Sequence, residues 1–304
     1  MSTDHQAAAA PEGAAGPGAV QEPREIPLRG MRGMIATKMR ESLQSTAQLT
    51  HHAGAELGAV QALRAHCRSA GLAPPSVQDV LLRLVVQTLQ DVPALNATLE
   101  DNRITEHPAV HLGLAVPLPD DLLLAPALFD AQAIALGTLP GARRDLVEQA
   151  QAGTLSVREL TGATFTVSNL GRSRVHHFTP ILNVPQVAIL GIGGSEARVV
   201  PDEAGGVRTA EVIGLSLTFD HRAVNGAPAA AFLDTLVERI EDEPDNTTRF
   251  LIVGTEDVPA SGEDKTSILV SMRNRPGALY GLLEPFQRHG IDLTRIETRP
   301  SPNE

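Results

Sequence analysis

The apolar run Ile213–Phe219 is the feature that most constrains the fold of this chain. It carries no charged side chain and is typical of a strand inside a sheet. A second such run, Val187–Leu190, precedes it, and the Gly- and charge-rich segment around Asp202–Gly206 between them predicts a hairpin. A helix is expected after the second strand, over Ala227–Ile240. We therefore expect a mixed sheet covered by helices, which is an α/β sandwich.

Other segments predict further helices and strands. Apolar residues recur every fourth position from Ile35 within Met34–Leu43, which is typical of an amphipathic helix. Ser76 followed by Asp79 predicts the N-cap and acidic first turn of a helix that Pro93 ends. Two short β-prone runs, Leu112–Leu118 and Thr164–Val167, predict strands. The segment Leu139–Ala152 predicts a helix that ends at Gly153.

The two ends of the chain differ in composition from its middle. Residues 1–24 are rich in Ala, Gly, Pro and Glu and offer almost nothing to bury, so we expect a disordered tail. An acidic, Pro-containing stretch near residue 242 indicates a second boundary, and we expect a linker over 243–265. Beyond it, 266–304 alternates as strand, helix and strand. This pattern predicts a small β-α-β fragment that cannot bury a core alone and so docks or oligomerises.

Composition excludes several classes of function. Aromatic residues make up 3% of the chain and the net charge is -11, which argues against a nucleic acid partner. Cys67 is the single cysteine, so no internal disulfide is expected and a reducing compartment fits. No apolar run approaches the roughly 18 to 20 residues of a membrane span, and no signal-peptide pattern opens the chain. We expect a cytoplasmic protein without a membrane partner.

His221 is the candidate general base. It ends the apolar strand and precedes a turn and a helix, a rigid boundary that a ligand can reach. Asn225 lies four residues on, where it can cap the helix or orient a neighbouring group. Ser168 closes the run Thr164–Val167. Taken singly, each of these residue types more often has a structural role, in which Asn225 caps the helix and Ser168 is a turn residue.

Their combination resembles a known family. The stretches Gly162–Gly171, Phe178–Gly191 and Phe219–Gly226 resemble, in order and spacing, the catalytic domain of 2-oxoacid dehydrogenase dihydrolipoamide acyltransferases and of chloramphenicol acetyltransferases. The likeness extends to Ile26–Arg32 and Val92–Ala97, and gives a catalytic domain over 25–242. It implies a chloramphenicol acetyltransferase-like two-layer sandwich with a mixed sheet, followed by the β-α-β fragment.

The resemblance also implies a homotrimer that uses acetyl-CoA or another acyl-CoA as cosubstrate. Its active sites lie at subunit interfaces, with His221 and Ser168 supplied by adjacent subunits. His221 then removes a proton from the attacking thiol or hydroxyl, and Ser168 donates a hydrogen bond to the oxyanion. Asn225 stands where most of the family has Asp; its amide can hold geometry but cannot balance the charge of an imidazolium.

The acyl acceptor is open on sequence alone. The family normally carries a lipoyl domain with an exposed lysine, whereas the only lysines here are Lys38 and Lys265, so we expect no covalent lipoyl group. A small-molecule hydroxyl is favoured, as in the standalone acetyltransferases of tetronate pathways that the chain resembles. A lipoyl group on a separate protein is the alternative. A non-catalytic scaffold or amino-acid sensor is the third hypothesis.

The C-terminal segment resembles a different family. Asn246–Phe250, Arg273–Tyr280 and Glu297–Pro300 resemble the junction and first half of the regulatory ACT domain of prephenate dehydratases, which binds phenylalanine. The second half is absent, and Thr298 replaces the Ser of that family. We expect a remnant or docking element, with amino-acid sensing as the alternative. Because the last helix runs into Glu241–Pro244, we also expect an isolated trimer rather than a cage.

Two other patterns are set aside. The pairs His51-His52 and His176-His177 have no third ligand at a sensible spacing, so no metal is expected. Gly191–Gly194 resembles a dinucleotide-binding loop, but a hairpin rather than a helix follows it. We therefore expect no nucleotide cofactor there.

Overall fold

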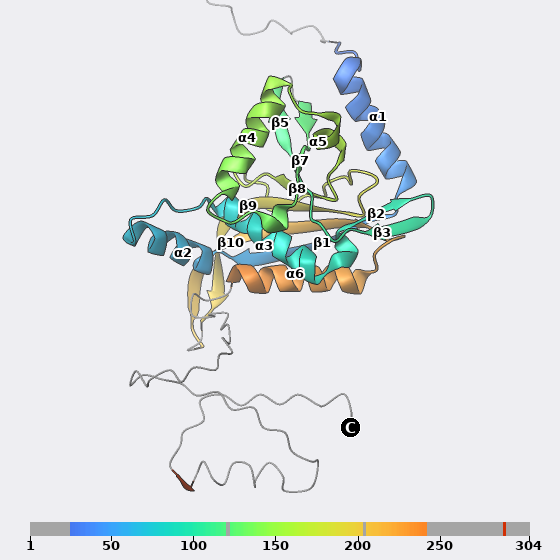
Figure 1. The fold of residues 1–304 in the computed structure, drawn as a ribbon. Coiled ribbons are helices and arrows are strands. Elements are labelled where there is room, and N and C mark those ends of the chain that lie inside the picture. Colours follow the sequence, from blue (N-terminus) through green and yellow to red (C-terminus); the bar gives the residue numbers. More distant parts are fainter. Residues whose placement is uncertain (1–24, 120–121, 203–204, 242–287, 290–304) are drawn as a thin grey trace, which may run out of the picture. The chain divides into compact units, whose positions relative to one another are not determined.

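The computed structural model describes residues 25–119, 122–202, 205–241 and 288–289 (Figure 1). Their centre is a six-stranded sheet in the order β1-β10-β9-β8-β4-β7. β8 is parallel to β4 and β9, and the other pairs are antiparallel, so the mixed sheet is confirmed. The strands are β1 Gln48–Glu56, β4 Leu112–Leu114, β7 Ala127–Leu128, β8 Phe165–Asn169, β9 Ala188–Pro201 and β10 Val207–Asp220.

Two small hairpins stand beside this sheet. β2 (Ala97–Glu100) pairs with β3 (Arg103–Glu106), and β5 (Val116–Leu118) pairs with β6 (Leu122–Leu124). The predicted run Leu112–Leu118 is therefore not one strand: it divides into β4 and β5, which belong to different sheets. Apolar composition alone does not distinguish one strand from two, because the break depends on which neighbours each half finds.

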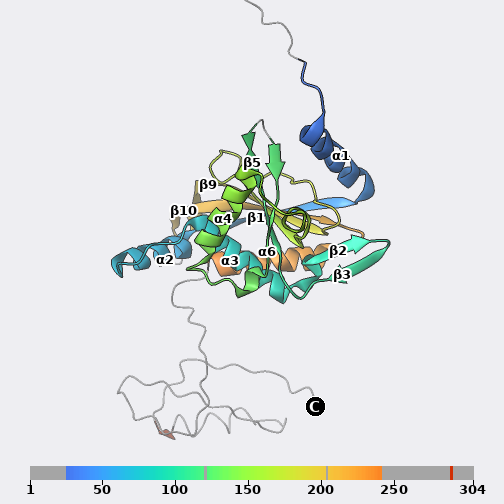
Figure 2. The same ribbon diagram turned by 45° about the horizontal axis from the view of Figure 1, so that its top comes forward.

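Helices complete the sandwich. α3 and α6 pack side by side across the sheet, and α6 lies against β1 (Figures 1 and 2). The Ser76 hydroxyl accepts from the Asp79 N–H at 3.1 Å, which confirms the predicted cap, and Gly153 ends α4 with φ 68°. The helices are α1 Gly30–Ser45, α2 Gly58–Ser69, α3 Val77–Asp91, α4 Leu139–Ala152, α5 Val157–Thr161 and α6 Gly226–Glu241, with 3-10 turns η1 Pro93–Leu95 and η3 Ala131–Ala133.

Large apolar side chains form the core between the sheet and these helices. Phe165, Phe219 and Phe232 are fully buried there, from β8, β10 and α6. Burial of such rings contributes a large share of the apolar area removed from water. The strand Ile213–Phe219 thus anchors the fold, as its composition predicts.

Helix α1 differs from the other long helices, because its apolar side chains do not reach this core. Met34 and Leu43 are 66% and 55% exposed, and Ser42 is the one buried residue of the helix. In both ribbon views α1 extends away from the sheet (Figures 1 and 2). The helix predicted over Met34–Leu43 forms, but none of its apolar residues is fully buried: Ile35 and Met39 are half-buried and Leu43 is exposed.

Strand β9 is much longer than the predicted Val187–Leu190. It continues through Gly191–Gly194 to Pro201, so these glycines are strand residues rather than a loop. A Cβ atom on Gly193 or Gly214 would collide with the carbonyl oxygen of His176. The glycines therefore allow the segment 173–178 to lie directly on the sheet.

The predictions for residues 1–24, for the linker 243–265 and for almost all of 266–304 lie outside the described residues. Contacts divide the chain into two units, Met1–Thr248 and Arg249–Glu304, and every element named above belongs to the first. In the described part of the chain no helix combines the length and the apolar character needed to cross a bilayer.

Candidate active site

His221 lies immediately after β10, on the turn that leads to α6. Its backbone N–H donates to the carbonyl oxygen of Ala47 at 2.8 Å, and its ring lies 5.9 Å from that of Phe219 between centroids. The side chain is exposed, and neither ring nitrogen bonds to another described residue. The backbone is thus fixed while the imidazole remains available to a reacting group.

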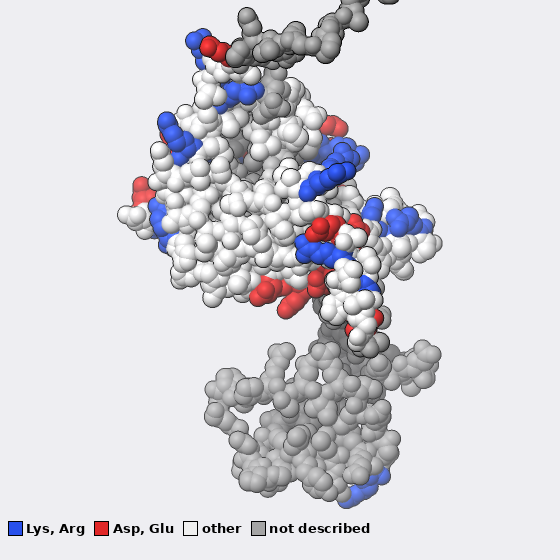
Figure 3. Space-filling model, turned by 180° about the vertical axis from the view of Figure 1, so that it is seen from behind, with Lys and Arg blue, Asp and Glu red and all other residues white. Residues whose placement is uncertain are grey.

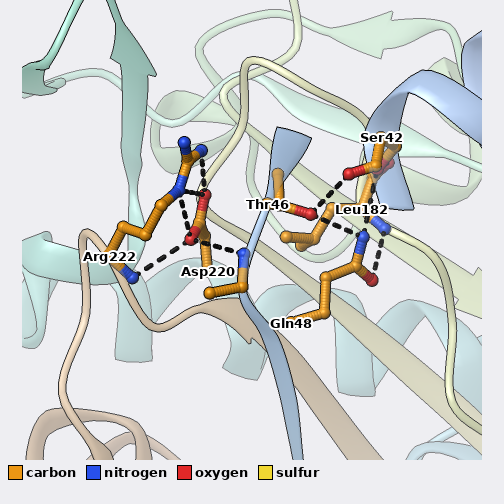
Figure 4. A network of polar contacts seen from close by, with 7 residues as sticks. Ser42, Thr46, Gln48, Leu182, Asp220 and Arg222 are labelled. Carbon is orange, nitrogen blue, oxygen red and sulfur yellow. Dashed lines mark hydrogen bonds and ion pairs between the residues drawn. The ribbon is translucent and has the colours of Figure 1, made fainter. Parts of the chain in front are cut away.

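The residues on either side of His221 form an ion pair. Asp220 is 2% exposed and receives the Arg222 guanidinium at 2.6 Å (Figure 4). It also accepts from the backbone N–H groups of Ala47, at 3.2 Å, and of Arg222, at 3.1 Å. Burial alone would raise the pKa of Asp220, but the hydrogen bonds from Arg222 and Ala47 outweigh it and lower the pKa.

Sequence reasoning missed this pair. The only signal for it was the run Asp220-His221-Arg222 itself, in which two opposite charges flank the histidine. Because the Asp220 carboxylate is satisfied by several donors, it fixes the turn that carries His221.

Asn225 directly precedes α6 and is exposed. Its backbone carbonyl accepts from the Ala229 N–H at 3.4 Å. Its side-chain amide makes no hydrogen bond within the described part of the chain, so it does not cap the helix. The amide is therefore free to contact the imidazole or a bound substrate.

Ser168 lies on β8, two strands away from the strand that carries His221. Its Cα stands opposite Gly191 on β9, which in turn stands opposite Ser216 on β10. His221 lies five residues beyond Ser216. At about 3.4 Å per residue and about 4.8 Å per strand, the Cα atoms of Ser168 and His221 lie roughly 20 Å apart. Within one chain they cannot act on the same atom.

The histidine pairs meet on another part of the sheet. The rings of His52 and His177 lie 5.3 Å apart between centroids, and His52 Nδ1 is 2.9 Å from the Ser216 hydroxyl. Burial and the neighbouring His177 and His51 lower the pKa of His52. Among the described residues, no group of three or more His, Cys, Asp or Glu side chains could hold a metal ion.

The mixed sheet, the long hairpin of β9 and β10 and the exposed histidine that follows make up a two-layer α/β domain with an accessible candidate base. Residues 20–248 match the model of the 2-oxoacid dehydrogenases acyltransferase (catalytic domain). The chain belongs to this family and contains its acyltransferase catalytic domain.

Named relatives agree with this assignment. The chain is 39% identical over 231 residues to the dihydrolipoyllysine-residue acetyltransferase component of the acetoin cleaving system of Bacillus subtilis, covering 73% of this chain and 56% of that protein. The dihydrolipoamide acetyltransferase of Azotobacter vinelandii superposes with TM-score 0.68 at 29% identity, over 73% of this chain and 92% of that one. The cubic core of the pyruvate dehydrogenase multienzyme complex also superposes with a TM-score of 0.68 at 29% sequence identity. The match covers 73% of this chain and 93% of that one.

The C-terminal segment has its own matches. Residues 266–304 match the ACT domain model. Over 81 residues the chain is 64% identical to the bifunctional chorismate mutase/prephenate dehydratase of Pseudomonas aeruginosa, covering 26% of this chain and 22% of that protein. The chain thus spans about half or less of the length of the curated relatives it matches.

Proposed function

We propose that this protein transfers an acyl group between CoA and a dihydrolipoyl group carried by another protein. The relatives that match the catalytic domain are dihydrolipoyllysine acetyltransferases, which favours this acceptor over the small-molecule hydroxyl expected from the sequence. None of the relatives named above is a tetronate-pathway enzyme. The lipoyl alternative therefore becomes the leading hypothesis.

The separation of Ser168 and His221 is the observation that carries the proposed mechanism. Two residues about 20 Å apart on one chain can meet only if a second copy supplies one of them. A cyclic trimer does this for every subunit in turn. The broad uncharged surface in Figure 3 suits burial against such copies, because charged residues are depleted at the core of interfaces.

The same three residue types occur in a characterised relative. The Azotobacter vinelandii enzyme was solved to study the role of a serine, a histidine and an asparagine in its catalytic mechanism. Its asparagine lies four residues after its histidine, as Asn225 follows His221. This spacing supports Asn225 as a functional residue. The sequence resemblance places Asp at this position in most of the family.

The chemistry follows from these positions. His221 of one subunit removes the proton from the thiol of the dihydrolipoyl group or of CoA, and the sulfur attacks the thioester carbonyl carbon. Ser168 of the next subunit donates a hydrogen bond to the oxyanion that forms. When the intermediate collapses, the carbon–sulfur bond to the leaving thiolate breaks and the imidazolium returns its proton to that sulfur. Asn225 holds the imidazole in the required orientation.

A mixing experiment tests the composite site. His221→Ala and Ser168→Ala chains are each expected to lose at least about 10²-fold in kcat with acetyl-CoA and dihydrolipoamide. When the two are co-expressed, the intact residues of different chains meet. Random assortment in a cyclic trimer predicts about a quarter of wild-type activity. A mixture no more active than its components contradicts a site shared between subunits.

The acceptor is tested on the wild-type chain. Turnover with free dihydrolipoamide, and higher turnover with a lipoylated domain, supports the proposal. Acetyl transfer to a primary alcohol but not to dihydrolipoamide would instead support the small-molecule reaction. No transfer to either, with heat released on phenylalanine binding, would support the scaffold or sensor hypothesis. Sedimentation distinguishes the isolated trimer that we propose from a cage.

A further inference from the structure

A hydrogen-bond network around Gln48, at the start of β1, joins segments that are distant in the sequence (Figure 4). The Gln48 amide nitrogen donates to Ser42 Oγ at 3.1 Å and to Thr46 Oγ1 at 2.9 Å. The amide oxygen accepts from the Leu182 N–H at 3.4 Å. Both ends of this amide are therefore engaged, which gives it one orientation.

Ser42 closes the network from the side of α1. Its hydroxyl donates to the Leu182 carbonyl oxygen at 2.7 Å, and its side chain is 0% exposed. Thr46 in turn donates to the Ser42 carbonyl at 2.6 Å. Because Ser42 is the one buried residue of α1, this junction attaches the end of the helix to the domain.

From Leu182 the hydrogen bonds continue toward Ser168. The next residue, Asn183, donates its amide to Thr166 Oγ1 at 3.2 Å, and that hydroxyl donates to Gln186 Oε1 at 2.6 Å. Thr166 is 1% exposed and lies two residues before Ser168 on β8. The position of Leu182 is thus linked to that of the Ser168 strand.

From Gln48 the connection to His221 is through the backbone. Gln48 stands opposite Asp220 in the pairing of β1 with β10. The residue before it, Ala47, accepts from the His221 N–H and donates to Asp220. Gln48 is therefore one side chain that links the Ser168 and His221 segments of one chain, in addition to the backbone pairing of β8, β9 and β10.

We propose that Gln48 is a positioning residue for acyl transfer, which adds to the backbone pairing of β8, β9 and β10 in holding Ser168 and His221 at their separation within each subunit. The inference rests on the proposed function. Ser168 and His221 of one chain belong to two different active sites, so an error in their separation displaces both sites. A displacement of about 1 Å can cost on the order of 10²-fold in rate. Among the described residues the Gln48 side chain bonds to Ser42, Thr46 and Leu182 and to no candidate site residue, so we expect its loss to affect kcat rather than binding.

The test compares Gln48→Leu, which keeps the size and removes the hydrogen bonds, with Gln61→Leu in the full chain. Gln61 is a matched control, because among the described residues its amide bonds to the exposed Glu211 and the half-buried Arg64, away from the candidate site. The measurements are kcat, KM for CoA and dihydrolipoamide, thermal midpoint, and hydrogen exchange of the segments 178–187 and 219–224. Ser42→Ala is a second variant that removes the same junction from α1.

We expect Gln48→Leu to lower kcat at least about tenfold with both KM values within about twofold, and to speed exchange in both segments. Ser42→Ala should act in the same direction, and the double variant should be no worse than the more severe single one. Unchanged exchange at 178–187 and 219–224, or an unchanged kcat, overturns the positioning role. The positioning role is also overturned if the fall in kcat is fully explained by a smaller fraction of folded protein. If the wild-type chain shows no turnover, the proposed function is refuted instead. Hydrogen exchange still tests the role of Gln48 in that case, because its measurement does not depend on activity.

Discussion

The backbone N–H of His221 donates to the carbonyl oxygen of Ala47 at 2.8 Å, so the turn that carries the candidate base is bonded to the start of β1. The N–H of Ala47 in turn donates to the Asp220 carboxylate at 3.2 Å. The backbone N–H and C=O groups of one residue, Ala47, thus both bind the His221 turn. This arrangement makes the charge state of Asp220 a determinant of local stability.

Asp220→Asn tests that dependence. The folded-state pKa of Asp220 is lowered, so its contribution to stability is present above the ordinary pKa of about 3.9 and is lost as pH falls through the folded value. We expect the variant to be less stable by about 1 to 3 kcal/mol at pH 7. The difference should narrow as the pH falls below about 4, because the carboxylate of the unfolded chain then binds a proton while that of the folded protein stays ionised to lower pH.

Urea unfolding of both proteins at neutral pH and at about pH 3.5, at one protein concentration, measures this difference. An equal difference at both pH values contradicts the assignment of the effect to the carboxylate charge.

Ser168→Ala removes a hydroxyl that makes no hydrogen bond within the described residues. We expect kcat to fall by about 10² to 10³, the cost of losing one oxyanion donor, with KM for acyl-CoA little changed. The fold should be unaffected, since no internal bond is lost. Steady-state kinetics measure the effect, and Ser69→Ala on α2, where the hydroxyl bonds only to the His66 carbonyl, is the matched control. Wild-type kcat in Ser168→Ala would exclude Ser168 as the donor.

Gly214→Ala tests the close approach of the segment 173–178 to the sheet. The added methyl group would collide with the His176 carbonyl oxygen, which is backbone and can move only with the whole segment. We expect a loss of about 1 to 3 kcal/mol, typical of overpacking, measured as a lower denaturation midpoint. Gly58→Ala is the control, because its methyl group would meet no atom within 4 Å. Equal stability of the two variants contradicts this packing.

Local patterns were enough to predict most helices, the strands β8 and β10 and the start of β9, but not β1, α2 or α5. Ser76 with Asp79 identified the start of α3, and Gly153 the end of α4, because capping depends on residues only a few positions apart. The continuation of β9 beyond Leu190 was not predicted, because its glycines weaken strand propensity and are explained only by the distant residue His176. The division of Leu112–Leu118 into β4 and β5 likewise depends on their partner strands.

The sequence by itself determined the family, the catalytic motif and the three residues His221, Ser168 and Asn225 as candidates, since these are patterns of residue type and spacing. Only the tertiary structure decided that Ser168 and His221 lie two strands apart, because strand order depends on contacts between distant segments. It also revealed that Asp220 is buried beside His221 and bonded to Ala47. The physical cause is long-range packing, because Ala47 is distant from Asp220 in the sequence and no local spacing encodes their contact.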